Sequence, residues 1–271
     1  MPYDKEMIIS DKYRFVFIHI PKCAGSYVRN AINCFDDTEG FFENKVCVHK
    51  ELGAIDYVHI TLPILERYFV HEYKKVCDYR SVAILRNPEQ RFFSSVSQHL
   101  KMKGKKLFHQ MNKDEQIECV KSIVQWLKVN RYELIYPAEY IHFMHQHMYI
   151  FNNGKRVVKH LYSLEQVDDV FGLISEITEQ KVNQKERSFA NASFVYKQEY
   201  VRSICEPLRP IYDMIKIILP KNHLLKIKKL FFREKDESDC LIKELFWVND
   251  FIRDFYEKDF EIWNEVRINN I

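Results

Sequence analysis

The residues best suited to bind a phosphate group follow an apolar run near the start of the chain. The run breaks at Pro21, and Lys22, two small residues and the hydroxyl of Ser26 follow before helix-compatible sequence begins. We expect a buried strand, a tight loop and a helix here. The first amides of a helix have no internal partners and its dipole favours an anion, so this stretch would hold a phosphate-like group.

A second set of phosphate-binding residue types follows another expected strand. Arg86 stands at the carboxyl end of that strand, where open α/β sheets place their ligands. On a helix that begins near Pro88, Arg91 and Ser94 lie within adjoining turns. A guanidinium beside a hydroxyl suits a second phosphate. The alternative is a capped surface helix with ordinary arginines.

Together the two stretches resemble the sulfotransferase family, most closely its membrane-bound and bacterial carbohydrate branch. The run from Phe17 to Ser26 looks like the family's 5′-phosphosulfate loop. The run from Arg86 to Ser94 is similar to its 3′-phosphate motif, R-x-P-x-x-R-x-x-S. Weaker similarity continues through Leu164-Glu165, Asn191-Ala192-Ser193 and Tyr256-Glu257-Lys258-Asp259.

This resemblance implies that the chain binds 3′-phosphoadenosine 5′-phosphosulfate (PAPS) and transfers its sulfuryl group to an acceptor. Lys22 would be catalytic, stabilising the charge on the leaving oxygen without a metal, and would contact the 5′-phosphate. Arg86 and Ser94 would hold the 3′-phosphate, with Arg91 supporting them from behind. The backbone amides that would cradle the 5′-phosphate belong to Cys23, Ala24, Gly25, Ser26 and Tyr27, where Tyr27 replaces the Ser or Thr of many relatives.

Sulfuryl transfer also needs a base for the acceptor hydroxyl. We expect His59, at the end of a short strand between the two phosphate motifs, to take this catalytic role, as a histidine in a similar segment does in several family members. A hydrogen-bonded core histidine is the alternative interpretation. His49 and Glu51 are lesser candidates for the base.

The pattern of apolar residues predicts an α/β fold. The resemblance adds a P-loop-like three-layer arrangement, with a central, mainly parallel sheet flanked by helices and a helical C-terminal part, in a single domain over residues 1–271. The expected strands cover Tyr13–Ile20, Ala54–Ile60 and Arg80–Arg86. The expected helices cover Gly25–Phe35, Leu62–Phe69, Glu89–Met102 and Asp114–Asn130, and an apolar stripe runs from Phe251 to Trp263. A hairpin around Asn152-Asn153-Gly154 would join Met148–Phe151 to Val157–Tyr162.

Composition limits the function and the compartment. The 41 basic and 38 acidic residues leave a net charge of +3, too even for a general nucleic-acid binder. The seven cysteines are scattered without a C-x-x-C pair, which favours free thiols in a reducing cytoplasm. The first residues do not read as a secretory signal, and the longest stretch without charged residues, Tyr140–Gly154, is too short to span a bilayer.

Three weaker patterns have simpler interpretations. His142, His145 and His147 have metal-like spacing, but no carboxylate or thiol completes the pattern, so we expect no metal site. The lysines from Lys101 to Lys106 suit a solvated face, or an anionic glycan. Asn191-Ala192-Ser193 matches a glycosylation acceptor, and a turn or the rim of the donor pocket is the simpler interpretation.

The sequence therefore predicts a cytoplasmic, bacterial-type sulfotransferase that acts on a carbohydrate hydroxyl in a polysaccharide or glycolipid. A glycolipid acceptor would bring the protein to a membrane surface, and the oligomeric state is left open. A P-loop kinase is the alternative, although the loop lacks G-x-x-x-x-G-K-[ST] and no magnesium-binding aspartate follows a strand. A nucleotide-binding protein without turnover is a third possibility.

Overall fold

The computed structural model describes residues 7–38, 47–104, 106, 108–182, 194–196, 232–234 and 246–268. The chain divides into two compact units, Met1–Arg187 with Ile242–Ile271, and Ser188–Leu241. In the second unit, the described residues form β9 (Phe194–Tyr196) and β10 (Phe232–Glu234), which pair antiparallel. The single-domain organisation stays a prediction.

A four-stranded sheet forms the centre of the first unit. Its order is β1 (Ile8–Ser10), β2 (Phe15–Ile18), β5 (Arg80–Leu85) and β8 (His160–Ser163). β2, β5 and β8 run parallel, and β1 pairs antiparallel with β2 at the edge. The residues of β2 are all buried, as expected for a strand covered on both faces. The expected mainly parallel sheet is confirmed.

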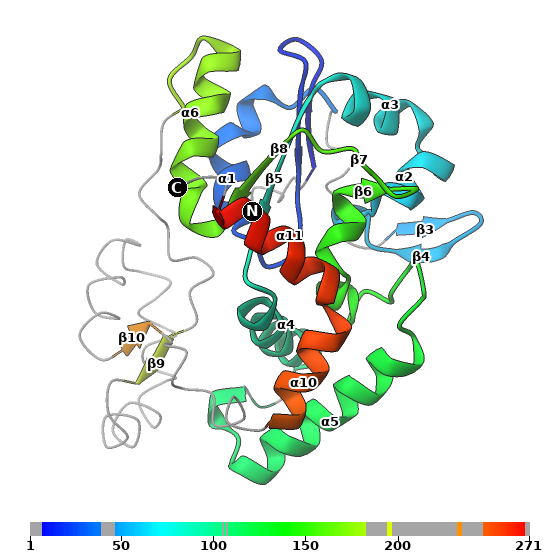
Figure 1. The fold of residues 1–271 in the computed structure, drawn as a ribbon, viewed down its shortest axis with the longest axis vertical. Coiled ribbons are helices and arrows are strands. Elements are labelled where there is room, and N and C mark those ends of the chain that lie inside the picture. The colour runs from blue at the N-terminus through cyan, green and yellow to red at the C-terminus, as the bar shows by residue number, and fades with distance from the viewer. Residues whose placement is uncertain are drawn as a thin grey trace, which may run out of the picture. The chain divides into compact units, whose positions relative to one another are not determined.

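Helices cover the sheet on both sides, as Figure 1 shows. α1 (Gly25–Ile32) and α6 (Val167–Thr178) lie on one side, and α2 (Leu62–Tyr68) and α3 (Val70–Asp78) lie on the other. α3, which the sequence pattern does not indicate, packs against β2 and β5. This arrangement confirms a mixed α/β fold with flanking helices.

Further helices complete the described part of the first unit. They are α4 (Pro88–Met102), α5 (Lys113–Val129), α10 (Phe246–Phe255) and α11 (Glu257–Ile268). α10 packs against α4, and α11 packs against β8, so the apolar C-terminal stripe faces the core as predicted. Short 3₁₀ helices cover Asn33–Phe35, Tyr57–His59, Phe108–Gln110, Ile141–Phe143, Gln146–Tyr149 and Leu164–Gln166. Within the described residues, no helix has the length and apolar character needed to cross a bilayer.

Two expected elements differ from the structure. The predicted strand Ala54–Ile60 is wrong: β4 (Gly53–Ile55) pairs with β3 (Cys47–His49) outside the central sheet. The strand ends because the Asp56 carboxylate accepts a hydrogen bond from the Val58 amide, at 2.9 Å, and caps a 3₁₀ turn.

The second difference concerns the hairpin around Asn153. It is shorter than predicted, because it joins only β6 (Phe151–Asn152) to β7 (Lys155–Arg156). The chain then leaves β7 and forms β8, which pairs with β5 of the central sheet. Burial of Leu161 in that sheet takes precedence over the local alternation that suggested a longer hairpin.

Candidate active site

The two predicted phosphate-binding loops meet at the carboxyl ends of β2 and β5. The Nη1 atom of Arg86 donates a hydrogen bond to the Lys22 carbonyl at 3.3 Å, which joins the loop after β5 to the loop after β2. Both side chains are half-buried. Two cationic residues thus lie together at the edge of the parallel sheet where such folds bind ligands, in a chain of nearly balanced charge.

The backbone of the first loop is tightly folded before α1. Lys22 and Ala24 adopt positive φ values of 65° and 57°, which non-glycine residues seldom do outside turns and functional sites. The Cys23 amide bonds to the carbonyl of Ile20, while the amides of Gly25 and Ser26 lie in the first turn of α1, where no intrahelical carbonyl can accept from them. The sequence assigns all the amides from Cys23 to Tyr27 to the 5′-phosphate, but those of Cys23 and Tyr27 already donate to protein carbonyls.

The Lys22 side chain turns towards α4. Its Nζ atom lies 3.4 Å from Oε1 of Gln98, a residue that sequence reasoning does not single out. Ser94 precedes Gln98 by four residues and therefore occupies the same face of α4. This spacing places the hydroxyl proposed for the 3′-phosphate on the helix face next to the loop.

A neighbouring imidazole ring leaves no room for a side chain at position 25. A Cβ atom on Gly25 would collide with the His19 ring, which is buried directly after β2. The His19 ring lies 5.0 Å from that of His59, measured between centroids. The start of α1 and the candidate base are therefore connected through one packed histidine.

We expect Gly25→Ala to destabilise the fold by about 1–3 kcal/mol, because the new methyl group must displace the His19 ring from a packed site. Gly172→Ala is the matched control: Gly172 is exposed in α6, its Cβ would meet no atom within 4 Å, and the change should stabilise the fold by about 0.5–1 kcal/mol. Urea unfolding of both variants measures the difference. An unchanged midpoint for Gly25→Ala would contradict the packing described here.

The Cys23 thiol is buried beside the loop and is not available for chemistry. Its Sγ atom is buried and lies 3.3 Å from Oε1 of Gln146. Burial raises the pKa of the thiol to about 12, although the charges of Arg91 and Arg86 oppose the shift. The thiol is therefore protonated at neutral pH and is not a nucleophile.

Gln146 fixes the two phosphate loops relative to each other. Its side-chain amide donates to the Arg86 carbonyl at 2.9 Å and accepts from the Arg86 amide at 3.0 Å, while Oε1 also contacts Cys23. Gln146 is completely buried. A buried side chain that satisfies both polar groups of one peptide position holds that backbone firmly.

Asp259 of α11 holds Gln146 in place. Its carboxylate accepts hydrogen bonds from the amides of Gln146 and His147, at 2.8 and 2.9 Å, and from the His147 ring at 3.0 Å. Burial opposes ionisation of Asp259, but the His147 hydrogen bond and the neighbouring positive charges hold its pKa below the ordinary value. The C-terminal helix thus anchors the phosphate loops through a carboxylate within the weakly similar Tyr256–Asp259 segment.

The side chains of Arg91 and Tyr27 pack against the surrounding core. Arg91 is completely buried, donates to the His142 carbonyl at 3.0 Å and lies over the Tyr256 ring, so its guanidinium supports the core behind the site. The Tyr27 ring packs edge-on against Phe171 of α6. The Tyr27 amide donates to the Ala24 carbonyl at 2.9 Å, so the structure leaves neither its ring nor its amide directed to a phosphate.

The candidate base belongs to a buried aspartate–histidine pair. Nδ1 of His59 lies 3.1 Å from Oδ2 of Asp56, and both side chains are 7% exposed. The carboxylate favours the tautomer with a proton on Nδ1, which makes Nε2 the nitrogen that can accept a proton. The His142 ring also packs edge-on against the His59 ring, with the centroids 5.2 Å apart. His59 ends a 3₁₀ helix rather than the strand that the sequence predicts.

The lesser candidates for the base stand in the β3–β4 hairpin. Nδ1 of His49 accepts the amides of Glu51 and Leu52, at 3.2 and 3.3 Å, and its ring packs against Tyr68. Glu51 is exposed. These contacts give His49 a structural function in the turn.

The histidine-rich segment forms a cluster that its spacing alone does not reveal. Donor atoms of His145, His147 and Asp259 lie within 4.8 Å of one another, so the sequence-based statement that no carboxylate completes the pattern is wrong. Burial lowers the pKa of His145 to about 4, with the charge of Asp259 acting in the opposite direction. The Asp259 carboxylate, however, is already held by protein donors, and Nη2 of Arg91 lies 3.7 Å away. The cluster therefore acts as the anchor of Gln146.

The remaining predicted features lie outside this cluster. Lys106 pairs with Glu115 at 2.8 Å, Lys103 lies over the Tyr140 ring, and Lys101 is exposed at the end of α4. Lys105 and Asn191-Ala192-Ser193 lie outside the described residues.

One comparison with known proteins identifies relatives of this chain. Residues 5–219 match a family model described as "Sulfotransferase family". No curated protein and no solved structure matches the chain.

Proposed function

The chain belongs to the sulfotransferase family, and we propose that it transfers the sulfuryl group of PAPS to a carbohydrate hydroxyl in a polysaccharide or glycolipid. The observation that carries this proposal is the contact between Arg86 and Lys22, which joins two loops suited to two phosphate groups of one nucleotide. A P-loop-like arrangement of β2, the Lys22 loop and α1 is part of the proposal.

In the proposed reaction, the acceptor oxygen attacks sulfur in line with the bond to the bridging oxygen. That bond breaks as the new S–O bond forms, and 3′,5′-bisphosphoadenosine leaves. Lys22 stabilises the charge that develops on the leaving oxygen, and the amides of Ala24, Gly25 and Ser26 hold the 5′-phosphate. His59 takes the proton of the acceptor hydroxyl, with Asp56 orienting the ring and stabilising its charged form.

A thermal-shift experiment tests the proposed donor. We expect bisphosphoadenosine to raise the melting temperature, because a ligand that binds only the folded state stabilises it. ATP with magnesium should have a smaller effect, because it lacks the 3′-phosphate. Stabilisation by ATP with magnesium alone would contradict the proposal and favour a kinase. A cytoplasmic location stays a prediction.

Arg86→Ala should weaken binding of the 3′-phosphate much more than binding of the 5′-phosphate. Loss of a charged hydrogen-bonding group should weaken bisphosphoadenosine binding by roughly 10- to 100-fold, and adenosine 5′-phosphate binding by only a few-fold. Isothermal titration of both nucleotides measures the ratio. Arg67→Ala, which removes an exposed guanidinium from α2, should change neither affinity. Equal losses for the two nucleotides would contradict the 3′-phosphate role of Arg86.

A further inference from the structure

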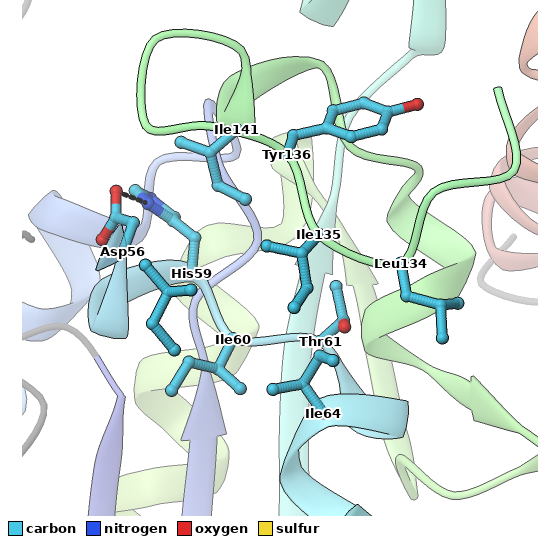
Figure 2. Close-up of a pocket in the computed structure, with 10 residues that line it drawn as sticks. Asp56, His59, Ile60, Thr61, Ile64, Leu134, Ile135, Tyr136 and Ile141 are labelled. Atoms are coloured by element: carbon cyan, nitrogen blue, oxygen red, sulfur yellow. Dashed lines mark hydrogen bonds and ion pairs between the residues drawn. The ribbon is translucent and has the colours of Figure 1, made fainter. Parts of the chain in front are cut away.

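An apolar hollow lies beside the Asp56–His59 pair. Figure 2 shows side chains from Asp56 to Ile64 facing side chains from Leu134 to Ile141 across it. The hollow is a shallow, half-open depression, in which the space between atoms amounts to about 290 Å³ when the open solvent is included. It therefore lies next to the position that the proposed function gives to the acceptor hydroxyl.

Branched aliphatic side chains form most of the wall. The aliphatic lining residues are Ile55, Ile60, Ile64, Leu134, Ile135 and Ile141. Leu134 is 48% exposed although it faces this hollow, and Ile135 is half-buried. Apolar surface left accessible around a concave site marks a place where an apolar ligand group gains from leaving water.

One hydroxyl group in the same wall lacks a hydrogen-bond partner among the described residues. It is Oγ1 of Thr61, on a side chain that is 2% exposed. A buried hydroxyl without a partner is unfavourable, and a ligand oxygen can satisfy it. The Tyr136 ring, by contrast, points away from the hollow and packs edge-on against Trp126. The wall thus suits a ligand that combines an apolar body with a hydroxyl group.

We propose that this hollow binds an apolar group adjacent to the reacting hydroxyl, so that the acceptor is an amphiphile such as the lipid-bearing end of a glycolipid. This inference rests on the proposed function, because it uses His59 as the acceptor's base. A sugar ring inside a polysaccharide offers its C–H face but no alkyl chain to the isoleucine wall. The apolar hollow therefore favours the glycolipid over the polysaccharide.

Alkyl glycosides of increasing chain length test the hollow directly. Methyl, butyl and hexyl β-D-glucoside, below their micellar concentrations, are titrated into the full chain saturated with bisphosphoadenosine, and ligand-observed NMR gives each Kd. Affinity should rise about fourfold for each CH₂ group until the hollow is filled, so the hexyl glycoside should bind at least tenfold more tightly than the methyl glycoside. Equal affinities would overturn the proposal in favour of a polysaccharide acceptor.

Two variants in one loop locate the effect. Ile135→Asn should abolish the dependence on chain length, because it places an amide in the wall. Tyr132→Asn, at a position that is 90% exposed and does not line the hollow, should leave that dependence unchanged. A chain-length dependence that survives Ile135→Asn would overturn the assignment.

Glycoside titrations without nucleotide, read together with the bisphosphoadenosine thermal shift, distinguish the hollow proposal from the donor proposal. If the glycosides show no chain-length preference while bisphosphoadenosine still raises the melting temperature, the hollow proposal fails and the donor proposal stands. If the preference depends on Ile135 but bisphosphoadenosine has no effect, the hollow's ligand class is supported and the proposed sulfuryl transfer fails.

Discussion

Replacing Lys22 with alanine is expected to lower kcat by about 10²–10³-fold. The ammonium group is proposed to neutralise charge that forms on the bridging oxygen as sulfur leaves, and loss of one such donor typically has an effect of this size. Substrate and bisphosphoadenosine affinities should fall much less, because the Arg86 site and the loop amides remain. Turnover of labelled donor, with Kd values from titration, measures the two effects separately.

The fold should tolerate this change. Lysine and alanine face the same restriction at the φ value of 65° that position 22 adopts, and the contact of the side chain with Gln98 is long, at 3.4 Å. Lys101→Ala, which removes an exposed ammonium from the end of α4, is the matched control and should keep full turnover. If Lys22→Ala lost donor affinity and kcat in the same proportion, Lys22 would be a binding residue without a special role in the transition state.

The local structure around the two phosphate motifs could be predicted from the sequence because its signals are local. The apolar run of β2 breaks at Pro21, and the start of α4 is marked by Asn87 and Pro88. The Asn87 side chain accepts the amides of Glu89 and Gln90, at 2.9 and 3.2 Å, as an N-cap residue should. Each of these elements is specified within about ten residues, which is the range over which sequence patterns are informative.

The anchor of the site could not be predicted in this way. Gln146 and Asp259 are 113 residues apart in the sequence, and their contact forms only after α11 packs against the sheet. The weak similarity at Tyr256–Asp259 marks the segment without indicating its partner. Gln98, by contrast, follows Ser94 by one helical turn, so helical periodicity could have placed it beside the predicted phosphate site.

The sequence places His59 at the end of a strand, whereas the structure places it in a 3₁₀ turn, and its role as the base stays a prediction. The alternation around Val58 suggested a strand, whereas the Asp56 carboxylate caps a turn and also bonds the His59 ring. Asx turns compete with strands through side-chain hydrogen bonds that apolar periodicity does not detect. The same aspartate therefore both ends the strand and orients the histidine, which places the imidazole beside the apolar hollow.

Replacing His59 with alanine is expected to lower kcat by about 10²–10⁴-fold, since this is the range that a positioned base contributes. Asp56→Asn should cause a smaller loss, because the asparagine can still cap Val58 but cannot stabilise the charged imidazole. The decline of kcat/KM towards acid pH that a histidine base produces should disappear in His59→Ala. Bisphosphoadenosine affinity should be unchanged in both variants.

Variants of the β3–β4 hairpin serve as controls for the assignment of His59 as the base. His49→Ala removes a histidine that accepts two backbone amides and packs against Tyr68, so it should lower stability while kcat and the acid limb of the pH profile are retained. Glu51→Gln, at an exposed position, should change neither. Loss of the acid limb in His49→Ala or Glu51→Gln, with a normal profile in His59→Ala, would transfer the role of the base to the hairpin. An unchanged kcat in all three variants would show that the acceptor hydroxyl loses its proton without any of them.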